Sequence, residues 1–600
     1  MYRGTWLIVA LPLLVAAFSV ARPAPLAAPP LPPAFGRTAV RDLAADLALR
    51  YPDRSPGSPG ATGAAQWFSD QLTPYGFKTR TDTFEATIPG RGRVRLQNLV
   101  AVAQGRSPDT IVVMAHRDDT GAGPGANDNA SGTAALIELA RGYANPGSSL
   151  RARPTHRIIF LSTDAGAFGG LGAEHFAADP VQSRDVVAVV NLVALGGKGR
   201  PRVEIAGDSP RSPAVSLVET TATRVLDQTG SMPTRPSALR QLVDLAFPFS
   251  MYEQAPFVAR GIPAVTLTTA PDRPPPSFGD TPERLNADRL AQLGRSTQEL
   301  MSSLDQGLEL TQGTSSYVYL GDRIVRGWAL ELVLIAALLP FLAAAVDLFA
   351  RCRRRRIPLT PALRSFRSRL AFWLFVGLLF EFLGVLGAWP RGATRPPSLE
   401  SSAATKIAFG PVIVLVLGSA LAWFMARERL LPRRPVLTEE ELAGYTAAFL
   451  ALAVVSLLVV GTNAFALVFV LPSLHAWLWL PQVRGRGTWT RALLVVAGFL
   501  GPLLLLWSLG SRYGLGLHAP WYLAVLVSVG YVPVTTVVIV LAWAAAAGQV
   551  AALATGRYAP YRGPRERPPL GPIRRIVGRT ILGVRRSRRA SAKPLRPLSG

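Results

Sequence analysis

The chain has 600 residues, of which 49% are hydrophobic, and its formal net charge is +26 at pH 7. This positive charge does not predict a nucleic-acid-binding protein, because the arginines gather beside apolar segments and in the C-terminal tail, where basic residues flank membrane spans. The single cysteine, Cys352, lies within the arginine-rich run 351–356. Disulfides and thiolate metal sites are therefore excluded from the more polar part of the chain, residues 38–310.

Residues 1–22 contain an apolar stretch that predicts either a cleaved signal peptide or an uncleaved signal anchor. The small residues of Ser19-Val20-Ala21 would suit a cleavage site, and the sequence leaves both interpretations open. Residues 23–37 are rich in proline and alanine and are typical of a linker. With either interpretation, we expect the segment that follows to be exported.

Residues 38–310 have the composition of a soluble domain in which apolar strands alternate with helices. We expect strands at 98–104, 110–115, 157–162, 186–193 and 263–269, and helices near 39–50, 61–73, 131–143, 212–228 and 285–305. Continuous apolar strands interleaved with helices predict an α/β fold, with a mixed, mostly parallel sheet flanked by helices. Ligands bind beyond the carboxyl ends of the strands in such sheets.

Polar residues follow the second of these predicted strands. His116 stands at its end, Asp118 comes two residues later, and Asp128 lies on a glycine-rich loop that enters a helix. A histidine and a carboxylate so placed are reasonable metal ligands, with Asp118 orienting the imidazole of His116. The same residues would also serve as turn and helix-cap residues. From their spacing alone, both interpretations stay open.

The motif around these residues resembles the signature of peptidase family M28, which comprises di-zinc aminopeptidases and their relatives. The resemblance begins with AHRDDTGAGPGANDNASGTAALIELAR, and the later stretches RIIFLSTDAGAFGGLGAEHF, VVAVVNLVALG and PFVARGIPAVTL follow in the order of the family. It covers roughly residues 38–306 and implies the zinc-peptidase fold for this domain. The overall layout also resembles the membrane-bound, multi-pass branch of the family.

The resemblance implies two zinc ions held by five side chains, and a glutamate that acts as general base. His116 matches the first ligand, and Asp128 matches the aspartate that bridges the two metals. The base position is occupied by Gly166, and the other ligand positions by Ala167, Val193 and Gln254. Catalytic zinc takes three protein ligands and a water molecule. We therefore expect no cofactor, or only weakly bound zinc, at a vestigial site.

Two acidic residues close to the lost positions are candidates to replace them. Asp164 lies two residues before the base position, and Glu253 adjoins Gln254.

Long apolar runs fill the region 328–546 and predict a transmembrane bundle of about seven helices. These runs lie near 328–349, 370–389, 407–425, 442–460, 464–481, 491–509 and 521–545. Arginine-rich loops fall on every second connection, which predicts eight passes with both termini cytoplasmic if the first segment is uncleaved. The domain 38–310 would then be extracytoplasmic. The basic cytoplasmic tail, residues 557–600, would bind anionic membrane lipid or only fix the orientation.

One acidic residue, Glu381, lies near the middle of its apolar run. An ionisable residue in a membrane span is a functional candidate by default, although a structural, hydrogen-bonded glutamate is the simpler interpretation. His475 is the candidate partner among the titratable residues of the bundle.

Together these features favour a cell-membrane protein with a peptidase-like extracytoplasmic domain that has lost most of its catalytic groups. Such a domain would bind a peptide, a cell-envelope fragment or a partner protein rather than nucleic acid. Two alternatives stay open. One is an active zinc aminopeptidase with a rearranged site, and the other is a receptor or sensor domain that serves a transporting bundle.

Overall fold

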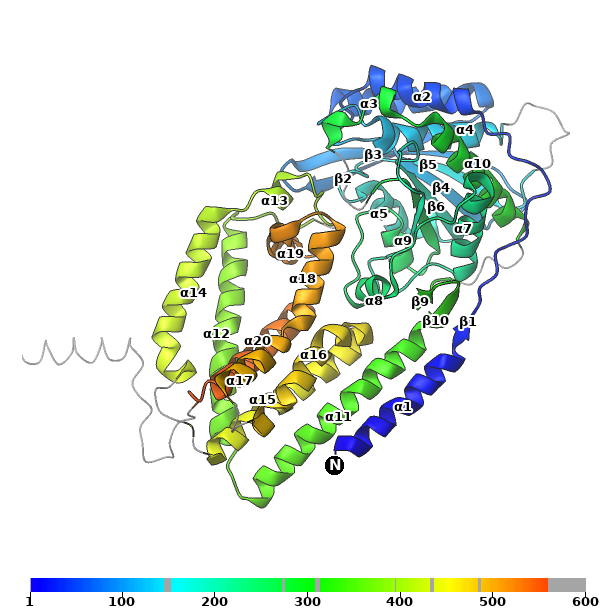
Figure 1. Ribbon diagram of the computed structural model, residues 1–600. Coiled ribbons are helices and arrows are strands. Elements are labelled where there is room, and N and C mark those ends of the chain that lie inside the picture. Colours follow the sequence, from blue (N-terminus) through cyan, green and yellow to red (C-terminus); the bar gives the residue numbers. More distant parts are fainter. Residues whose placement is uncertain are drawn as a thin grey trace, which may run out of the picture.

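The computed structural model describes residues 2–144, 153–271, 276–307, 313–393, 395–431, 436, 438–483 and 487–558. Figure 1 shows two regions, an α/β domain and a bundle of long helices. The hairpin of β9 (Tyr317–Leu320) and β10 (Arg323–Arg326) leads from the domain into α11 (Gly327–Arg354), a long helix of the bundle.

The α/β domain is built on a seven-stranded sheet with strand order β2-β3-β5-β4-β6-β8-β7. The strands are β2 (Arg80–Ile88), β3 (Gly92–Ala103), β4 (Thr110–His116), β5 (Arg157–Thr163), β6 (Val186–Val193), β7 (Arg202–Glu204) and β8 (Ala264–Thr268). The four central strands, β5, β4, β6 and β8, are parallel, whereas β2, β3 and β7 pair antiparallel. The predicted α/β fold with a mixed, mostly parallel sheet is confirmed.

Helices cover both faces of this sheet, because alternate residues of each buried strand point to opposite sides. On one face, Val113 packs with α2 (Arg37–Arg50), α3 (Pro59–Leu72), α4 (Gly132–Arg141), α7 (Val215–Thr229) and α10 (Ala287–Gln306). On the other face, Val112 and Met114 pack with α5 (Leu171–Ala178) and α9 (Ala255–Ala259).

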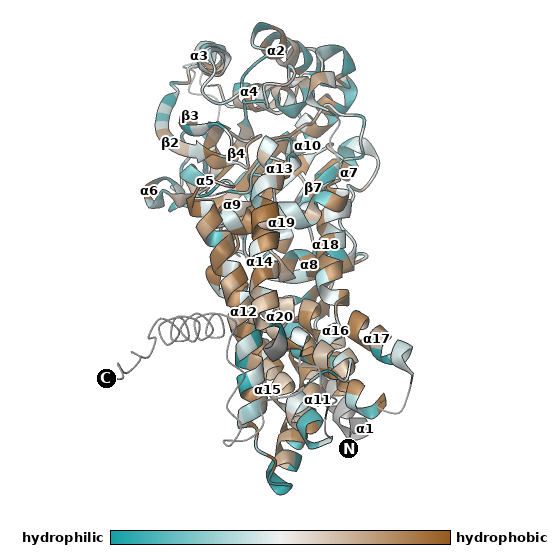
Figure 2. Ribbon diagram, turned by 90° about the vertical axis from the view of Figure 1, so that its left-hand side faces the viewer, coloured by the Kyte–Doolittle hydropathy of each residue, from teal (hydrophilic) through white to brown (hydrophobic). Residues whose placement is uncertain are grey.

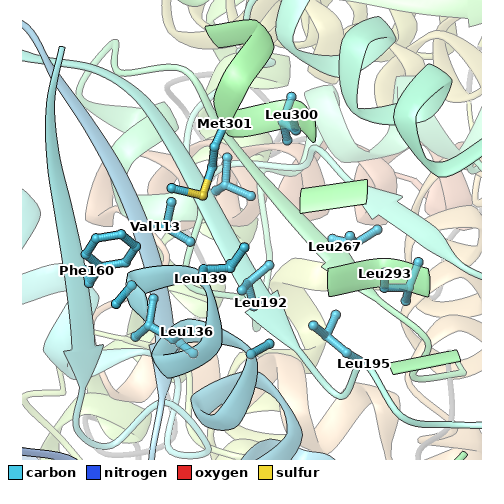
Figure 3. Close-up of a cluster of buried hydrophobic side chains, with 14 of the residues drawn as sticks. Val113, Leu136, Leu139, Phe160, Leu192, Leu195, Leu267, Leu293, Leu300 and Met301 are labelled. Carbon is cyan, nitrogen blue, oxygen red and sulfur yellow. The ribbon is translucent and has the colours of Figure 1, made fainter. Parts of the chain in front are cut away.

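The larger core lies between the sheet and helices α4 and α10. Figure 3 shows Val113, Leu192 and Leu267 from three strands facing Leu136 and Leu139 of α4 and Leu300 and Met301 of α10. Truncating one such buried leucine to alanine typically costs about 2–5 kcal/mol. This core holds the strand ends in place and so fixes the loops that follow them.

The bundle consists of helices that are predominantly hydrophobic, whereas hydrophilic residues are frequent on surface elements of the domain such as β2 and α6 (Pro180–Ser183) (Figure 2). Besides α11 it contains α1 (Tyr2–Phe18), α12 (Thr360–Val385), α14 (Phe409–Leu430), α15 (Thr438–Asn463), α16 (Leu467–Leu478), α17 (Thr488–Ala497), α18 (Leu500–Arg512), α19 (Ala519–Ser528) and α20 (Val534–Ala554). Within the described residues, five helical segments are long and apolar enough to cross a membrane, or six if the bent pair α17–α18 is one span. These segments indicate a multi-pass membrane protein.

Two of these segments differ from the apolar runs expected from the sequence. The stretch Thr438–Val483 is a single apolar segment of 46 residues, with a break between α15 and α16 where Asn463 has extended backbone angles. The run expected at 521–545 is divided into α19 and α20. The division follows from Gly530, whose φ is +90°, and from Pro533, because neither residue suits a helix interior.

The basic connection between α11 and α12 lies at the end of the bundle remote from the α/β domain (Figure 1). The arginines predicted to flank later spans at 433, 434, 484 and 486, and nearly all of the basic tail at 559–600, lie outside the described residues. At the start of the chain, α1 runs beside α11, and β1 (Val20–Ala21) pairs with β10.

Candidate ligand-binding site between the domain and the bundle

A cavity of about 190 Å³ lies at the carboxyl ends of β4 and β6, as expected for an α/β sheet. Its walls come from both regions of the molecule. The α/β domain contributes residues that include His116, Asp128, Gly166, Val193 and Glu253, and the bundle contributes Ser398, Leu399, Glu400, Arg512 and Tyr513.

The buried imidazole of His116 lies between two carboxylates. Its Nδ1 atom is 3.3 Å from Oδ1 of Asp118, and its Nε2 atom is 3.3 Å from Oδ1 of Asp128. Burial by itself would lower the pKa of His116, but the attraction of Asp118 and its hydrogen bond, together with Asp128, raise that pKa well above 6.5. The structure thus brings together His116 and Asp128, the two predicted metal ligands, and Asp118, the residue predicted to orient the imidazole.

Asp118 also fixes the loop that follows β5. Its carboxylate accepts hydrogen bonds from the backbone N–H groups of Gly166, at 2.7 Å, and Ala167, at 3.0 Å. This loop lies directly against His116. A Cβ atom added at Gly166 would lie 2.2 Å from the His116 Cβ atom, a separation that real side chains do not show. The base position therefore has no room for a glutamate unless His116 moves.

The other ligand positions of the resemblance are also committed to different roles. Ala167 and Val193 line the cavity with aliphatic groups. Gln254 is fully buried, and its amide donates hydrogen bonds to the Ala206 carbonyl at 2.8 Å and to Ser250 Oγ at 3.2 Å. Its carbonyl accepts a hydrogen bond of 2.6 Å from the Thr266 hydroxyl. Gln254 thus joins the segment before α9 to β8.

Of the two possible replacements, Glu253 faces the cavity. It is 1% exposed, and its Oε1 atom accepts a hydrogen bond of 2.6 Å from the Thr163 hydroxyl. Its Oε2 atom has no hydrogen-bond partner among the described residues. Burial raises the pKa of Glu253 to about 7, although His116 and the Thr163 hydrogen bond oppose this rise.

Asp164 occupies a different place. Its Oδ2 atom lies 3.3 Å from Nη2 of Arg117 and accepts a hydrogen bond of 3.1 Å from the Gln97 N–H, while its Oδ1 atom accepts from the Ala165 N–H at 2.9 Å. These contacts hold Asp164 at a separate cavity lined by the arginines of β3. The structure therefore brings Glu253, and not Asp164, into the cavity of His116.

The residues present do not fit the zinc ions that the resemblance implies. Among the described residues, no three histidine, cysteine, aspartate or glutamate side chains are grouped so that they could hold a metal ion. His116 and Asp128 are adjacent, but Ala167, Val193 and Gln254 offer no suitable ligand in their present positions. Zinc normally takes three protein ligands, and that number is not reached.

A buried arginine, Arg54, supports the loop between β4 and α4 that carries Asp118 and Asp128. Arg54 donates hydrogen bonds to the carbonyl groups of Arg117, at 2.8 Å, and Pro124, at 2.8 Å, and its Nη1 atom lies 3.2 Å from Asp119. Burial raises the pKa of Asp119 to about 6, and Arg54 opposes that shift. The buried guanidinium group of Arg54 thus holds the loop between β4 and α4 in place.

The bundle reaches the cavity through two arginines that sequence reasoning missed. Arg395, in the connection between α12 and α14, is almost fully buried against the domain. Its Nε donates to the Gly169 carbonyl at 2.6 Å, its Nη2 donates to the Ser250 carbonyl at 3.0 Å, and its guanidinium forms an ion pair with Asp208. These contacts hold the segment 395–400 on the cavity rim.

The second arginine, Arg512, ends α18. Its guanidinium lies 3.0 Å from Glu204 and 2.5 Å from Asp244, two acidic residues of the domain. Burial raises the pKa of Asp244 to about 6, and Arg512 opposes the rise. Beside this pair, Phe249 of the domain packs edge-on against Tyr513 of the bundle, with ring centroids 5.0 Å apart. No local motif marks these contacts, because Arg512 and Asp244 are separated by 268 positions.

Glu381 lies near the end of α12 and not at its centre, and it has a cationic neighbour. Its Oε2 atom is 3.1 Å from Nη2 of Arg391, and both side chains are largely exposed. His475 lies elsewhere in the bundle, with its Nε2 atom 3.0 Å from the Ala337 carbonyl. The ion pair with Arg391 explains why a charged side chain is present at position 381.

Residues 98–301, which lie within the α/β domain, match the family model described as Peptidase family M28. Among curated proteins, the chain is similar to BOS complex subunit ncln of Danio rerio, with 26% identity over 36% of this chain and 39% of that protein. It is also similar to the alkaline phosphatase isozyme conversion protein of Escherichia coli, with 26% identity over 28% of this chain and 52% of that protein. A probable zinc metalloprotease of Pyricularia oryzae is 30% identical over 27% of this chain and 37% of its own length.

The chain thus spans about half the length, or less, of these curated relatives. Among solved structures, an aminopeptidase from Aneurinibacillus sp. strain AM-1 matches with 15% identity and a TM-score of 0.37, covering 45% of this chain and 94% of that chain. A glutaminyl cyclase from an Acidobacteriales bacterium matches with 23% identity and a TM-score of 0.36, covering 48% of this chain and 99% of that chain.

Proposed function

We propose that this is a membrane protein whose M28 domain binds a ligand or partner in the cavity between domain and bundle without hydrolysing peptides. The observation that carries the proposal is the contact of Gly166 with His116. Hydrolysis by this family needs a base to take a proton from the attacking water, and a positioned base contributes about 10²–10⁴-fold to such reactions. The space for that base is filled by His116, at a hypothetical Cβ separation of 2.2 Å.

The remaining ligand positions support the same conclusion. Gln254 uses both ends of its amide in hydrogen bonds that are unrelated to the cavity. The names of the relatives do not decide the matter, because they include a complex subunit as well as a zinc metalloprotease. Fold similarity alone does not establish activity, so the proposal rests on the site.

The arrangement of the chain supports an extracytoplasmic placement of the domain. The arginine-rich connection after α11 lies at the opposite end of the bundle from the domain (Figure 1), and basic loops mark the cytoplasmic side. The pairing of β1 with β10 and the position of α1 beside α11 favour an uncleaved anchor. In intact cells, a membrane-impermeant maleimide is expected to label Glu283→Cys on the domain and to leave Arg355→Cys unlabelled. The reverse pattern would contradict this orientation.

The proposed lack of hydrolysis is tested on the full chain, purified in detergent. Bound zinc is measured by mass spectrometry of the metal, and activity is measured as release of nitroaniline from leucine 4-nitroanilide with and without added zinc. We expect substoichiometric zinc and no turnover that a chelator removes. Stoichiometric zinc together with chelator-sensitive turnover would overturn the proposal and support a rearranged aminopeptidase site.

A further inference from the structure

The cavity carries an excess of acidic side chains. Among the described residues, its walls contain five carboxylates, from Asp119, Asp128, Glu253, Asp280 and Glu400, against the three basic groups of His116, Arg202 and Arg512. A cavity with low-dielectric walls concentrates the field of such charges and favours a ligand of the opposite sign.

The basic groups neutralise only part of this excess: among the wall carboxylates only Asp128 lies against one of them, and the other acids that they contact lie outside the cavity lining. His116 lies between Asp118 and Asp128. Arg512 is paired with Glu204 and Asp244, and Arg202 also contacts Glu204. Two of these acids, Glu204 and Asp244, lie outside the cavity lining.

Three of the wall carboxylates are held by hydrogen bonds, although His116 attracts Glu253 and Arg54 attracts Asp280 from a longer distance. Glu253 accepts a hydrogen bond from Thr163, Asp280 accepts from the backbone N–H groups of Asn127 and Asp128, and Glu400 accepts from Ser277. Within the described residues, none of the three forms an ion pair. They come from three distant segments of the chain, and Glu400 belongs to the bundle.

Glu253 indicates where a ligand group would bind. It is 1% exposed, and the buried Oε2 atom has no hydrogen-bond donor among the described residues. A buried acceptor left without a donor carries a desolvation penalty, which is larger when the acceptor is charged. A donor from a ligand in the cavity would remove that penalty.

The volume of the cavity and its aromatic wall residues limit the class of ligand that it can bind. The cavity volume of about 190 Å³ is below the roughly 300–1,000 Å³ of sites for drug-sized ligands, so it suits one side chain rather than a folded partner. Tyr252 contributes an aromatic ring, a group that attracts cations through its face, whereas the ring of Tyr513 already has the Arg512 guanidinium 5.3 Å from its centroid.

We propose that this cavity binds an organic cation of the size of one amino-acid side chain, an ammonium or guanidinium group, with Glu253 of the domain and Glu400 of the bundle as its anionic partners. The proposal rests on the non-hydrolytic binding function above and names its ligand class. The site is composite, because the carboxylate at its mouth comes from the segment that Arg395 anchors to the domain.

Binding is measured by calorimetry on the full chain in detergent, with Nα-acetylarginine amide and Nα-acetyllysine amide as probes. Acetylation removes the α-ammonium group, so that only the side-chain cation is tested. Nα-acetylcitrulline amide, which has nearly the shape of the arginine probe but no charge, is the matched neutral control. We expect at least one cationic probe to bind roughly tenfold or more tightly than the citrulline probe, a difference of about 1.4 kcal/mol. Equal binding of the charged and neutral probes, or no binding, would overturn the inference.

Two variants test the named carboxylates. Glu253→Gln keeps an acceptor for the Thr163 hydroxyl, and Glu400→Gln changes an exposed loop residue, so we expect both proteins to fold. Each change should weaken binding of the cationic probe roughly tenfold or more, since a hydrogen bond to a charged group is stronger than one between neutral groups. Glu283→Gln, an exposed carboxylate that does not line the cavity, should leave binding unchanged.

The outcomes separate this inference from the proposed function. If neither Glu253→Gln nor Glu400→Gln weakens binding, or if binding requires added zinc, the inference is overturned. If no probe binds and no hydrolysis occurs, the non-hydrolytic proposal stands and only the ligand class is wrong. If chelator-sensitive hydrolysis occurs, the proposed function fails whatever the probes do.

Discussion

The α/β domain and the bundle bury their apolar side chains in different surroundings. The domain has a hydrophobic core on each face of its sheet, and all seven residues of β4 are buried. In the bundle, none of the apolar window of α14 is buried within the protein, and only 17% of that of α12 is. Both regions therefore have a hydrophobic core, but α12 and α14 leave most of their apolar surface exposed, as expected for helices that face lipid.

The comparison also shows where the two regions depend on each other. At their contact, charged pairs accompany apolar packing: Arg395 and Arg512 of the bundle pair with Asp208, Glu204 and Asp244 of the domain, and Phe249 of the domain packs in a cluster with apolar residues of the bundle. These contacts form one side of the cavity. The binding site of the domain is thus completed by residues of the bundle, which has a separate hydrophobic core.

The largest expected effect is the loss of this charged contact. Arg512→Ala would leave Glu204, which is 1% exposed, and Asp244 without their shared cation. Removing one partner of a buried ion pair costs about 3–5 kcal/mol. We expect a strongly lowered melting temperature of the full chain in detergent, and a loss of probe binding.

Arg37→Ala is the matched control, because its partner Asp288 and its own side chain are both exposed. An exposed ion pair contributes about 0–1 kcal/mol, so this variant should unfold close to the parent. If both arginine variants were equally stable, the contact between domain and bundle would not depend on charge.

An intermediate effect is expected inside the domain. Gly166→Glu places a side chain against His116 and should destabilise the protein by about 1–3 kcal/mol, as overpacked sites do. The neighbouring variant Ala167→Glu is the control. Because Ala167 lines the cavity, we expect this variant to shift the melting temperature less. If Gly166→Glu had unchanged stability in a denaturant titration, His116 would be able to move aside and position 166 could hold a glutamate as general base.

The smallest effect is expected at Glu381. Its pair with Arg391 is largely exposed, so Glu381→Gln should change stability by no more than about 1 kcal/mol. This variant tests whether the bundle contains a functional charge at this position. A large change in stability or in ligand binding would contradict the interpretation of Glu381 as part of a surface ion pair.

The sequence predicts much of the fold, since β4, β5, β6, β8 and the second half of β3 are apolar runs. It misses β2 because that edge strand alternates exposed and half-buried residues, with only Ile88 buried. It also misses β7, which has three residues. The hydrophobic pattern of the sequence reveals strands that are buried on both faces, but it reveals edge strands poorly.

The candidate site is predictable only in part, for a similar reason. His116, Asp118 and Asp128 follow one strand, so the rule that ligands bind at strand ends brings them together. Asp164 is as close to the base position in sequence as Asp118 is to His116, but Arg117 and the Gln97 N–H hold its carboxylate elsewhere. The roles of Arg395 and Glu400 depend on contacts across more than a hundred positions, which no local pattern encodes.

The position of Arg512 late in the chain has a consequence for biosynthesis. Its partner Asp244 precedes it by 268 residues, and ribosomes add about 5–20 residues per second. Roughly 10–50 s therefore separate the appearance of the two groups. During that interval the newly made domain exposes the aromatic surface around Phe249, and Glu204 has only Arg202 as a cationic neighbour, so the arrival of α18 is the step that completes this wall of the cavity.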